Sequence, residues 1–177
     1  LGIVASIIAF VSLALPWWTM PISGTYMGIK MSGDMSVYTH DARVTMEAMG
    51  FKATESIVDG FSIWYGYAAL ALIVLAGVAG IVGSLLIGKN GKMILLVAGI
   101  LALVSIIIFA AGLQGELGDL PIEVSLFDSG SFMGLDYSTY LTFGFWMALV
   151  SAIIAFIAAL KHPMAPLAAA APPKKES

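Results

Sequence analysis

Four long apolar stretches without a charged residue alternate with more polar segments along this chain of 177 residues. The stretches cover residues 1–20, 64–88, 93–113 and 140–160. A helix of about 20 residues, rising about 1.5 Å per residue, crosses the roughly 30 Å hydrocarbon core of a bilayer. Because backbone polar groups inside lipid must pair within their own segment, each stretch predicts a transmembrane helix and not an open strand.

A different pattern runs through the two segments between these stretches, residues 21–63 and 114–139. Short runs with a period of two, bounded by glycine or aspartate, are typical of strands and turns. The predicted strands are residues 25–31, 35–39, 43–49 and 51–58 in the first segment and 122–127 in the second, with a turn at Gly33-Asp34. The two segments therefore predict one small antiparallel sheet of four or five strands, resting on the ends of the helices.

Composition indicates that this fold lies in a membrane. Hydrophobic residues make up 60% of the chain and charged residues 11%. Soluble domains average about 45–50% and about 25%. A water-soluble fold has too little polar surface to cover so much apolar material, so the bilayer must do so. We therefore predict a membrane protein of all-α class, a four-helix bundle that carries a small extracellular β-sheet.

Charge predicts how the helices are oriented. The short turn at residues 89–92 and the tail at residues 161–177 together carry five lysines against one acid. The segments 21–63 and 114–139 carry ten acids against three bases. Since basic residues collect on the cytoplasmic side of membrane proteins, both chain termini are predicted in the cytoplasm and both long segments outside the cell membrane. The tail, rich in alanine and proline, is predicted to be disordered.

Two sets of residues fit a role in the membrane. Large aromatic residues gather at the predicted outer ends of the helices and predict an interfacial belt. The belt residues are Trp17, Trp18, Trp64, Tyr65 and Trp146. In the second stretch, small residues recur every four positions, which lets helix backbones approach closely. These helix-packing residues are Ala76, Gly80 and Ser84 in one row and Ala79 and Gly83 in another.

The arrangement resembles the claudins and the peripheral myelin proteins related to them. Those four-helix membrane proteins also have inner termini, a long first outer segment and a shorter second one, and the two segments share a sheet. Trp17 or Trp18 stands where that family has an early tryptophan, and residues 60–64 echo its Gly-Leu-Trp motif. The family's two cysteines are absent, because the chain contains none. The resemblance covers most of the chain and implies adhesion through the outer sheet.

The sequence contains few residues that could form a catalytic site. The chain has no cysteine, and its two histidines, His40 and His162, are predicted on opposite sides of the membrane, where they cannot share a site. Ionisable side chains, which pumps place inside the membrane, are missing from all four stretches. We therefore predict no enzyme and no cofactor. Without a basic patch or a phosphate-binding loop, we also predict no nucleic-acid partner.

Methionines spaced by four residues are the most specific chemical signal. Met27, Met31 and Met35 precede His40, and thioethers with an imidazole suit Cu(I). The alternative is that these methionines fill gaps between the sheet and the aromatic residues. Both interpretations stay open at the level of sequence.

The lack of polar chemistry in the helices favours a structural role. We expect a non-enzymatic accessory subunit that associates with itself, or with a larger membrane complex, through its helices and outer sheet. One alternative is claudin-like adhesion to neighbouring cells or envelope layers. Another is the handling of copper for a membrane metalloenzyme. In each of these three hypotheses, the chain is also expected to contact the lipid bilayer.

Overall fold

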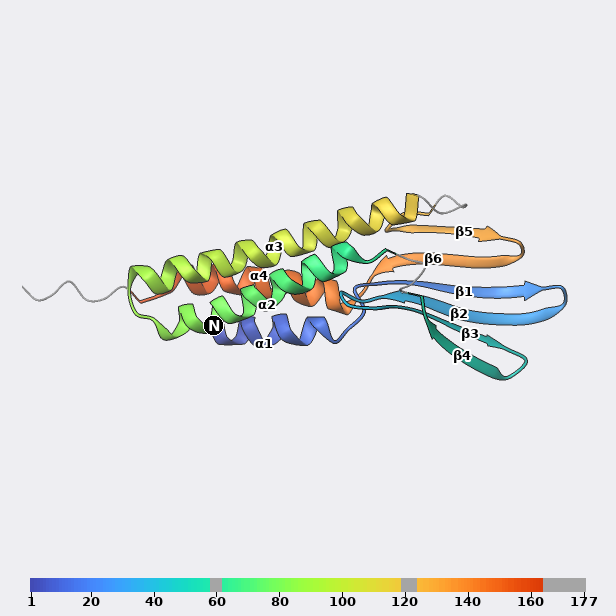
Figure 1. Ribbon diagram of the computed structural model, residues 1–177, viewed down its shortest axis with the longest axis horizontal. Helices are drawn as coiled ribbons and strands as arrows, with labels where there is room; N and C mark the ends of the chain where they lie inside the picture. Colours follow the sequence, from blue (N-terminus) through green and yellow to red (C-terminus); the bar gives the residue numbers. More distant parts are fainter. Residues whose placement is uncertain (58–61, 119–123, 164–177) are drawn as a thin grey trace, which may run out of the picture.

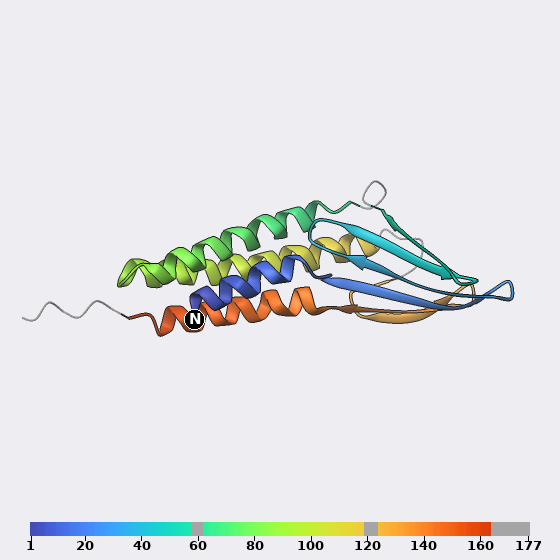
Figure 2. The ribbon, with the colours of Figure 1, turned by 90° about the horizontal axis from the view of Figure 1, so that it is seen from below.

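A computed structural model describes residues 1–57, 62–118 and 124–163, which form four helices and six strands (Figure 1). In chain order these are α1 (Gly2–Leu13), β1 (Trp18–Tyr26), β2 (Ile29–Val37), β3 (Ala42–Ala48), β4 (Phe51–Ser56), α2 (Trp64–Leu85), α3 (Lys89–Gly118), β5 (Asp128–Phe132), β6 (Leu135–Leu141) and α4 (Phe143–Leu160). The helices lie side by side, and the strands project from one end of them along the long axis of the molecule (Figures 1 and 2). Most of the predicted disordered tail lies outside the described residues.

Three of the helices are long and apolar enough to cross a membrane, judged by length and composition over the described residues. They are α2, α3 and α4, with 22, 30 and 18 residues. α1 packs against α2 and α4, and α3 packs against the same two helices. This set of long apolar helices fits a membrane location.

The first helix is shorter than the span predicted over residues 1–20. It has 12 residues and ends at Leu13, and strand β1 already begins at Trp18. Pro16 explains the early end, because proline lacks the N–H that a helix needs and disfavours helical backbone in the preceding residue. The chain enters the sheet instead, where the Trp17 N–H donates a hydrogen bond of 2.8 Å to the Val37 carbonyl.

The other helix boundaries also differ from the sequence prediction. α3 begins at Lys89, so residues 89–92 are its first turn and not a loop. The true connection is shorter, and Gly88 permits it by adopting a φ of +86°, which glycine tolerates best. α4 begins at Phe143, because the residues up to Leu141 pair within the sheet.

Small residues fill many of the contacts between helices, and many of the large ones face outward. The buried residues of α1 are Gly2, Ala5, Ser6, Ala9 and Ser12. By contrast, the side chains of Ile7, Leu75 and Ile107 are 57%, 55% and 65% exposed. Soluble proteins do the reverse and fill their cores with large apolar side chains. Close packing through small residues is typical of helices surrounded by lipid.

The six strands form one antiparallel sheet in the order β4-β3-β2-β1-β6-β5. The sequence predicts four or five strands, with one in the second segment, so the count is wrong. Residues 124–127 of the strand predicted at 122–127 lie outside any strand, and a hairpin over 128–141 follows instead. The alternation of Leu135 and Tyr137 with Asp136 and Ser138 is the period-two signal of this segment.

The first reversal of the chain also falls elsewhere than predicted. Gly33-Asp34, the predicted turn, lies in the middle of β2, where both residues pair with strands on either side. The turn is Met27-Gly28, with φ of 51° and 81°. Such two-residue turns need positive φ at both positions, and their usual sequence is Asn-Gly. A methionine in the first position therefore hid the turn from sequence reasoning.

Candidate functional site

Strand register separates the side chains of the sheet into two faces. Cross-strand partners such as Met20 and Met35 lie on the same face, because successive side chains along a strand alternate. One face, here called the apolar face, carries Trp18, Met20, Ile22, Tyr26, Ile29, Met31, Met35, Val37, Ala42, Val44, Met46, Ala48, Phe51, Ala53, Phe132, Leu135, Tyr137 and Leu141. Its two acids, Glu55 and Asp128, lie on the edge strands. Most of the sheet's charged residues point to the opposite face.

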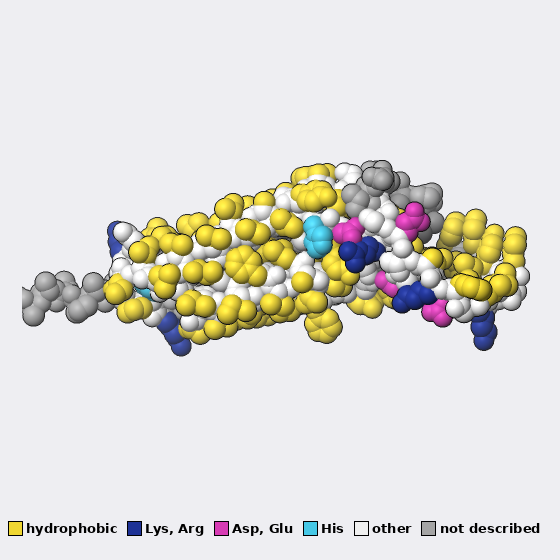
Figure 3. Space-filling model, turned by 60° about the horizontal axis from the view of Figure 1, so that its bottom comes forward, with side chains coloured by type: hydrophobic (Ala, Val, Ile, Leu, Met, Phe, Trp, Pro, Cys, Tyr) yellow, Lys and Arg dark blue, Asp and Glu magenta, His cyan; other side chains and the backbone are white. Residues whose placement is uncertain are grey.

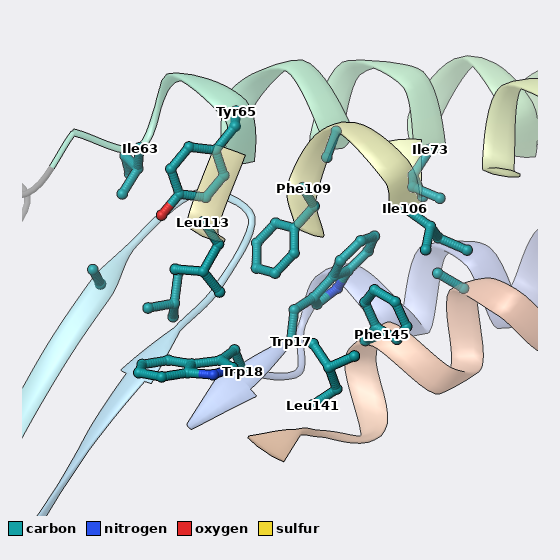
Figure 4. Close-up of a cluster of buried hydrophobic side chains, with 14 of the residues drawn as sticks. Trp17, Trp18, Ile63, Tyr65, Ile73, Ile106, Phe109, Leu113, Leu141 and Phe145 are labelled. Carbon is teal, nitrogen blue, oxygen red and sulfur yellow. The ribbon is translucent and has the colours of Figure 1, made fainter. Parts of the chain in front are cut away.

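The end of the apolar face next to the helices is buried in a core that it shares with them (Figure 4). The Trp17 ring lies at the centre of this core, 4.9 Å from the Phe109 ring and 6.0 Å from the Phe145 ring between centroids. Its Nε1–H donates a hydrogen bond of 2.9 Å to the Ser12 carbonyl. Trp18, from the first position of β1, is fully buried beside it. Aromatic packing of this kind holds the sheet firmly on the helices.

The predicted interfacial belt needs correction because of this core. Trp17, Trp18 and Tyr65 are fully buried, so they do not face a membrane interface. Their large rings fill the joint between helices and sheet, which small helix residues cannot fill. Trp64 and Trp146 are 62% and 47% exposed, which suits an interfacial position.

The residues of the copper hypothesis lie apart in the structure. Met27 is in a turn, and Met31 and Met35 follow on the same extended strand. At about 3.3 Å per residue, Met31 and Met35 are roughly 13 Å apart, whereas metal–sulfur bonds are about 2.3 Å long. His40 lies beyond the other end of β2, with its ring 5.8 Å from the Tyr38 ring. These residues therefore form no copper site here, and the buried Met35 packs in the core.

The small residues predicted to pack the second helix lie at its contacts with α1 and α3. A Cβ atom at Gly80 would overlap the Ser6 hydroxyl of α1, and one at Gly83 would be 3.0 Å from Leu95 of α3. Of the other three residues, Ala76 is buried, and Ala79 and Ser84 are half-buried. Larger side chains at Gly80 and Gly83 would force these helices apart.

A polar cluster fixes the connection between β2 and β3. The Asp41 carboxylate accepts hydrogen bonds from Arg43 Nε over 2.5 Å and from the Ser56 hydroxyl over 2.8 Å. The Arg43 guanidinium also lies 5.3 Å from the centroid of the Tyr38 ring. Partial burial raises the pKa of Asp41, but the hydrogen bonds from Arg43 and Ser56 outweigh burial and bring this pKa below its ordinary value. This cluster has a structural role and holds three strands together.

None of the helices that the structure describes covers the half of the apolar face that lies away from them. The helices end before this distal half begins, and Met31 and Met46 are only half-buried. Figure 3 shows hydrophobic side chains along the helices and again at the far end of the sheet, with charged side chains between them. A pocket of about 80 Å³ opens on this face, lined only by its own residues: Met20, Ile22, Phe132, Leu135 and Tyr137.

Uncovered apolar surface of this kind marks contact sites in proteins. We therefore take the distal apolar face, the half of the apolar face beyond the helix ends, as the candidate functional site. Sequence reasoning missed it, because the alternation along a strand does not tell which part of a face the helices cover. One signal was available in the sequence. The dipeptide Met-Gly occurs three times, at residues 27, 49 and 133, and each occurrence is a turn at the end of the sheet away from the helices.

No protein-family model matches this chain, and no curated protein matches it. The resemblance to claudins stays a prediction from the sequence. The chemistry of the site is thus the basis for any functional proposal.

Proposed function

We propose that this chain is a non-enzymatic accessory subunit of a membrane assembly, and that it docks to its neighbours through the distal apolar face. The observation that supports this function is that the helices leave the distal half of the apolar face uncovered. Burial of apolar surface contributes about 25 cal/mol of favourable free energy for each Å² removed from water, so such a face favours association. The pocket between Ile22 and Phe132 offers a place for one apolar side chain of the partner.

We also propose how the molecule is oriented in the membrane. Lys89, Lys92 and Lys161 lie at the end of the molecule opposite the sheet. Since basic residues collect on the cytoplasmic side, this end faces the cytoplasm and the sheet stands outside, with both termini inside. The helices α2, α3 and α4 then cross the bilayer, and the shorter apolar helix α1, packed against α2 and α4, leads from the cytoplasmic side to the sheet.

The direction of the sheet favours a neighbour in the same membrane. The strands continue the direction of the helices along the long axis of the molecule (Figure 2). When the helices cross a bilayer, the faces of such a sheet point sideways, parallel to the membrane plane. The distal apolar face is therefore turned toward a protein alongside, either a second copy or another subunit.

A pair of neighbouring residues on β2 tests this function. Met31 lies on the apolar face, and Ser32 lies next to it on the opposite face and is exposed. Met31→Glu places a charge in the proposed interface, where an unpaired charge is strongly unfavourable, whereas Ser32→Glu places it in water. We expect chemical cross-linking and mild-detergent sizing to show loss of the assembly with Met31→Glu and an intact assembly with Ser32→Glu.

Circular dichroism and thermal unfolding of both variants check that the sheet still forms. A wild-type protein that is strictly monomeric in native membranes and copurifies with no partner would refute the proposed function. Equal assembly of the two variants would refute the distal apolar face as the docking surface.

A further inference from the structure

Three hairpin turns of the sheet have the same unusual construction. Each is a two-residue turn of sequence Met-Gly, at Met27-Gly28, Met49-Gly50 and Met133-Gly134. The methionines have φ of 51°, 53° and 52°, and the glycines 81°, 80° and 81°. All three of these two-residue turns therefore place a methionine in the left-handed backbone conformation.

A methionine is a poor choice for this conformation. Positive φ is uncommon outside glycine, and asparagine or aspartate are the residues that tolerate it best. Packing does not compensate for the strain, because Met27, Met49 and Met133 are 84%, 72% and 65% exposed. Strain that persists in the folded state often marks a functional position. What the three positions share is a long, flexible, apolar side chain presented to the surroundings.

The residues beside the turns strengthen this apolar character. Tyr26, Phe51 and Phe132, each next to a turn, are 39%, 82% and 46% exposed. None of the four-residue stretches 26–29, 48–51 and 132–135 contains a charge. We call these three stretches the hairpin tips. They lie at the far end of the molecule from the helices (Figures 1 and 2).

Charged residues stand directly behind the tips. Lys30 follows the first tip and Lys52 the second, which makes two of the three basic residues of the sheet. Glu47 lies opposite Lys52 on the neighbouring strand, and Asp136 follows the third tip. Long lysine side chains can reach past apolar groups, so both amines are able to contact anionic headgroups beside inserted tips.

We propose that the hairpin tips insert into the interfacial layer of a second lipid bilayer, opposite the membrane that holds the helices. This inference rests on the membrane placement proposed above but not on lateral assembly, because the inserting methionines, Met27, Met49 and Met133, lie in the turns and not on the distal apolar face. Protruding tips with flexible side chains suit a fluid lipid surface, whereas a protein interface needs a closely fitted patch. Exposed aromatic and apolar groups backed by lysines are the pattern of interfacial membrane anchors.

A substitution to asparagine separates binding from folding. In the triple variant Met27→Asn, Met49→Asn and Met133→Asn, each turn gains its preferred sequence Asn-Gly. We expect its unfolding temperature to equal or exceed that of the wild type. Because each inserted methionine contributes about tenfold in affinity, we expect the triple variant to bind vesicles roughly a thousandfold less tightly.

The measurement is flotation of the full chain, held in nanodiscs, with vesicles of phosphatidylcholine alone or mixed with phosphatidylglycerol. The wild type is expected to float with both kinds of vesicle, because Lys30 and Lys52 behind the tips are balanced by Glu47 and Asp136. Empty nanodiscs give the background. The matched control is Phe127→Ser, which removes an apolar side chain that is 61% exposed but lies outside the tips, and which should leave flotation unchanged.

Three results would overturn the inference. The first is a triple variant that floats as the wild type does, and the second is a folded wild type that never floats with vesicles. The third is nanodiscs that pair with each other through the tips and ignore vesicles, which would assign the tips to a second copy of the chain. Failure of lateral assembly appears separately, in the cross-linking of Met31→Glu within one membrane.

Discussion

Pro16 and Trp17 determine, at the scale of residues, where helix gives way to sheet. The Pro16 carbonyl accepts a hydrogen bond of 3.0 Å from the Gly144 N–H, at the start of α4. A Cβ atom at Gly144 would overlap the Trp17 ring, so only glycine lets α4 approach so closely. The end of α1 and the beginning of α4 are thereby held together.

Asp41 makes one contact of the sheet sensitive to pH. Because its pKa is lower in the folded chain than in the unfolded one, its contribution to stability is present above the unfolded pKa of about 3.9. That contribution is lost as the pH falls through the lower folded value. Arg43 is half exposed, so we expect the contribution to be less than about 1 kcal/mol.

We predict that acidification below about pH 4 lowers the unfolding temperature of the wild type more steeply than that of Asp41→Asn. Ser56→Ala, which removes one hydrogen bond to the carboxylate, should give an intermediate slope. Thermal unfolding by circular dichroism across this pH range is the measurement. Identical slopes for the wild type and Asp41→Asn would contradict a role for this carboxylate.

Close approach of helices is the main feature at the scale of elements, and two glycines of α3 test it. A Cβ atom at Gly112 would overlap the Tyr65 side chain of α2, whereas one at Gly115 would meet no atom within 4 Å. We expect Gly112→Ala to destabilise the chain by about 1–3 kcal/mol through overpacking. Gly115→Ala should stabilise it by up to about 1 kcal/mol, because alanine favours helix.

Denaturant unfolding of both variants in detergent compares these two free energies of unfolding. The pair is matched, since the same substitution is made three residues apart on one helix. Equal stability of the two variants would mean that α2 and α3 do not pack as closely as described.

The sequence predicts long elements better than short ones. Residues 64–85 and 93–113 form helices as expected, because an uncharged apolar run of this length has one stable form in lipid. Strands of five to nine residues give weaker signals. Gly33-Asp34 looked like a turn but is held within β2 by pairing on both sides, which is a tertiary effect that local sequence does not contain.

The candidate site was less predictable than the helices. Trp17 and Trp18 are of the residue type that prefers membrane interfaces, yet both are buried. Their burial depends on how the sheet packs on the helices, which the local sequence does not show. The period of two in the sequence correctly placed Met31 in the sheet. It did not reveal that Met31 and Met46 lie beyond the ends of the helices, because coverage of a face depends on the whole fold.

The whole molecule is a long object whose two ends differ in chemistry. One end carries Lys89, Lys92 and Lys161, while the other carries the sheet, with its polar face, its distal apolar face and its hairpin tips. Apolar side chains cover the helices between these ends (Figure 3). We propose that a membrane holds the helices and that the sheet stands outside it to make contacts.

Cysteine labelling tests this central claim most directly, because the chain contains no cysteine of its own. Three single variants sample the molecule: Lys30→Cys near a hairpin tip, Lys89→Cys at the opposite end and Ile107→Cys on an exposed helix face. With a membrane-impermeant maleimide on intact cells, we expect labelling of Lys30→Cys alone. Lys89→Cys should react only after the membrane is opened, and Ile107→Cys should stay unreactive until detergent is added. Labelling of Lys89→Cys but not Lys30→Cys in intact cells would contradict the account.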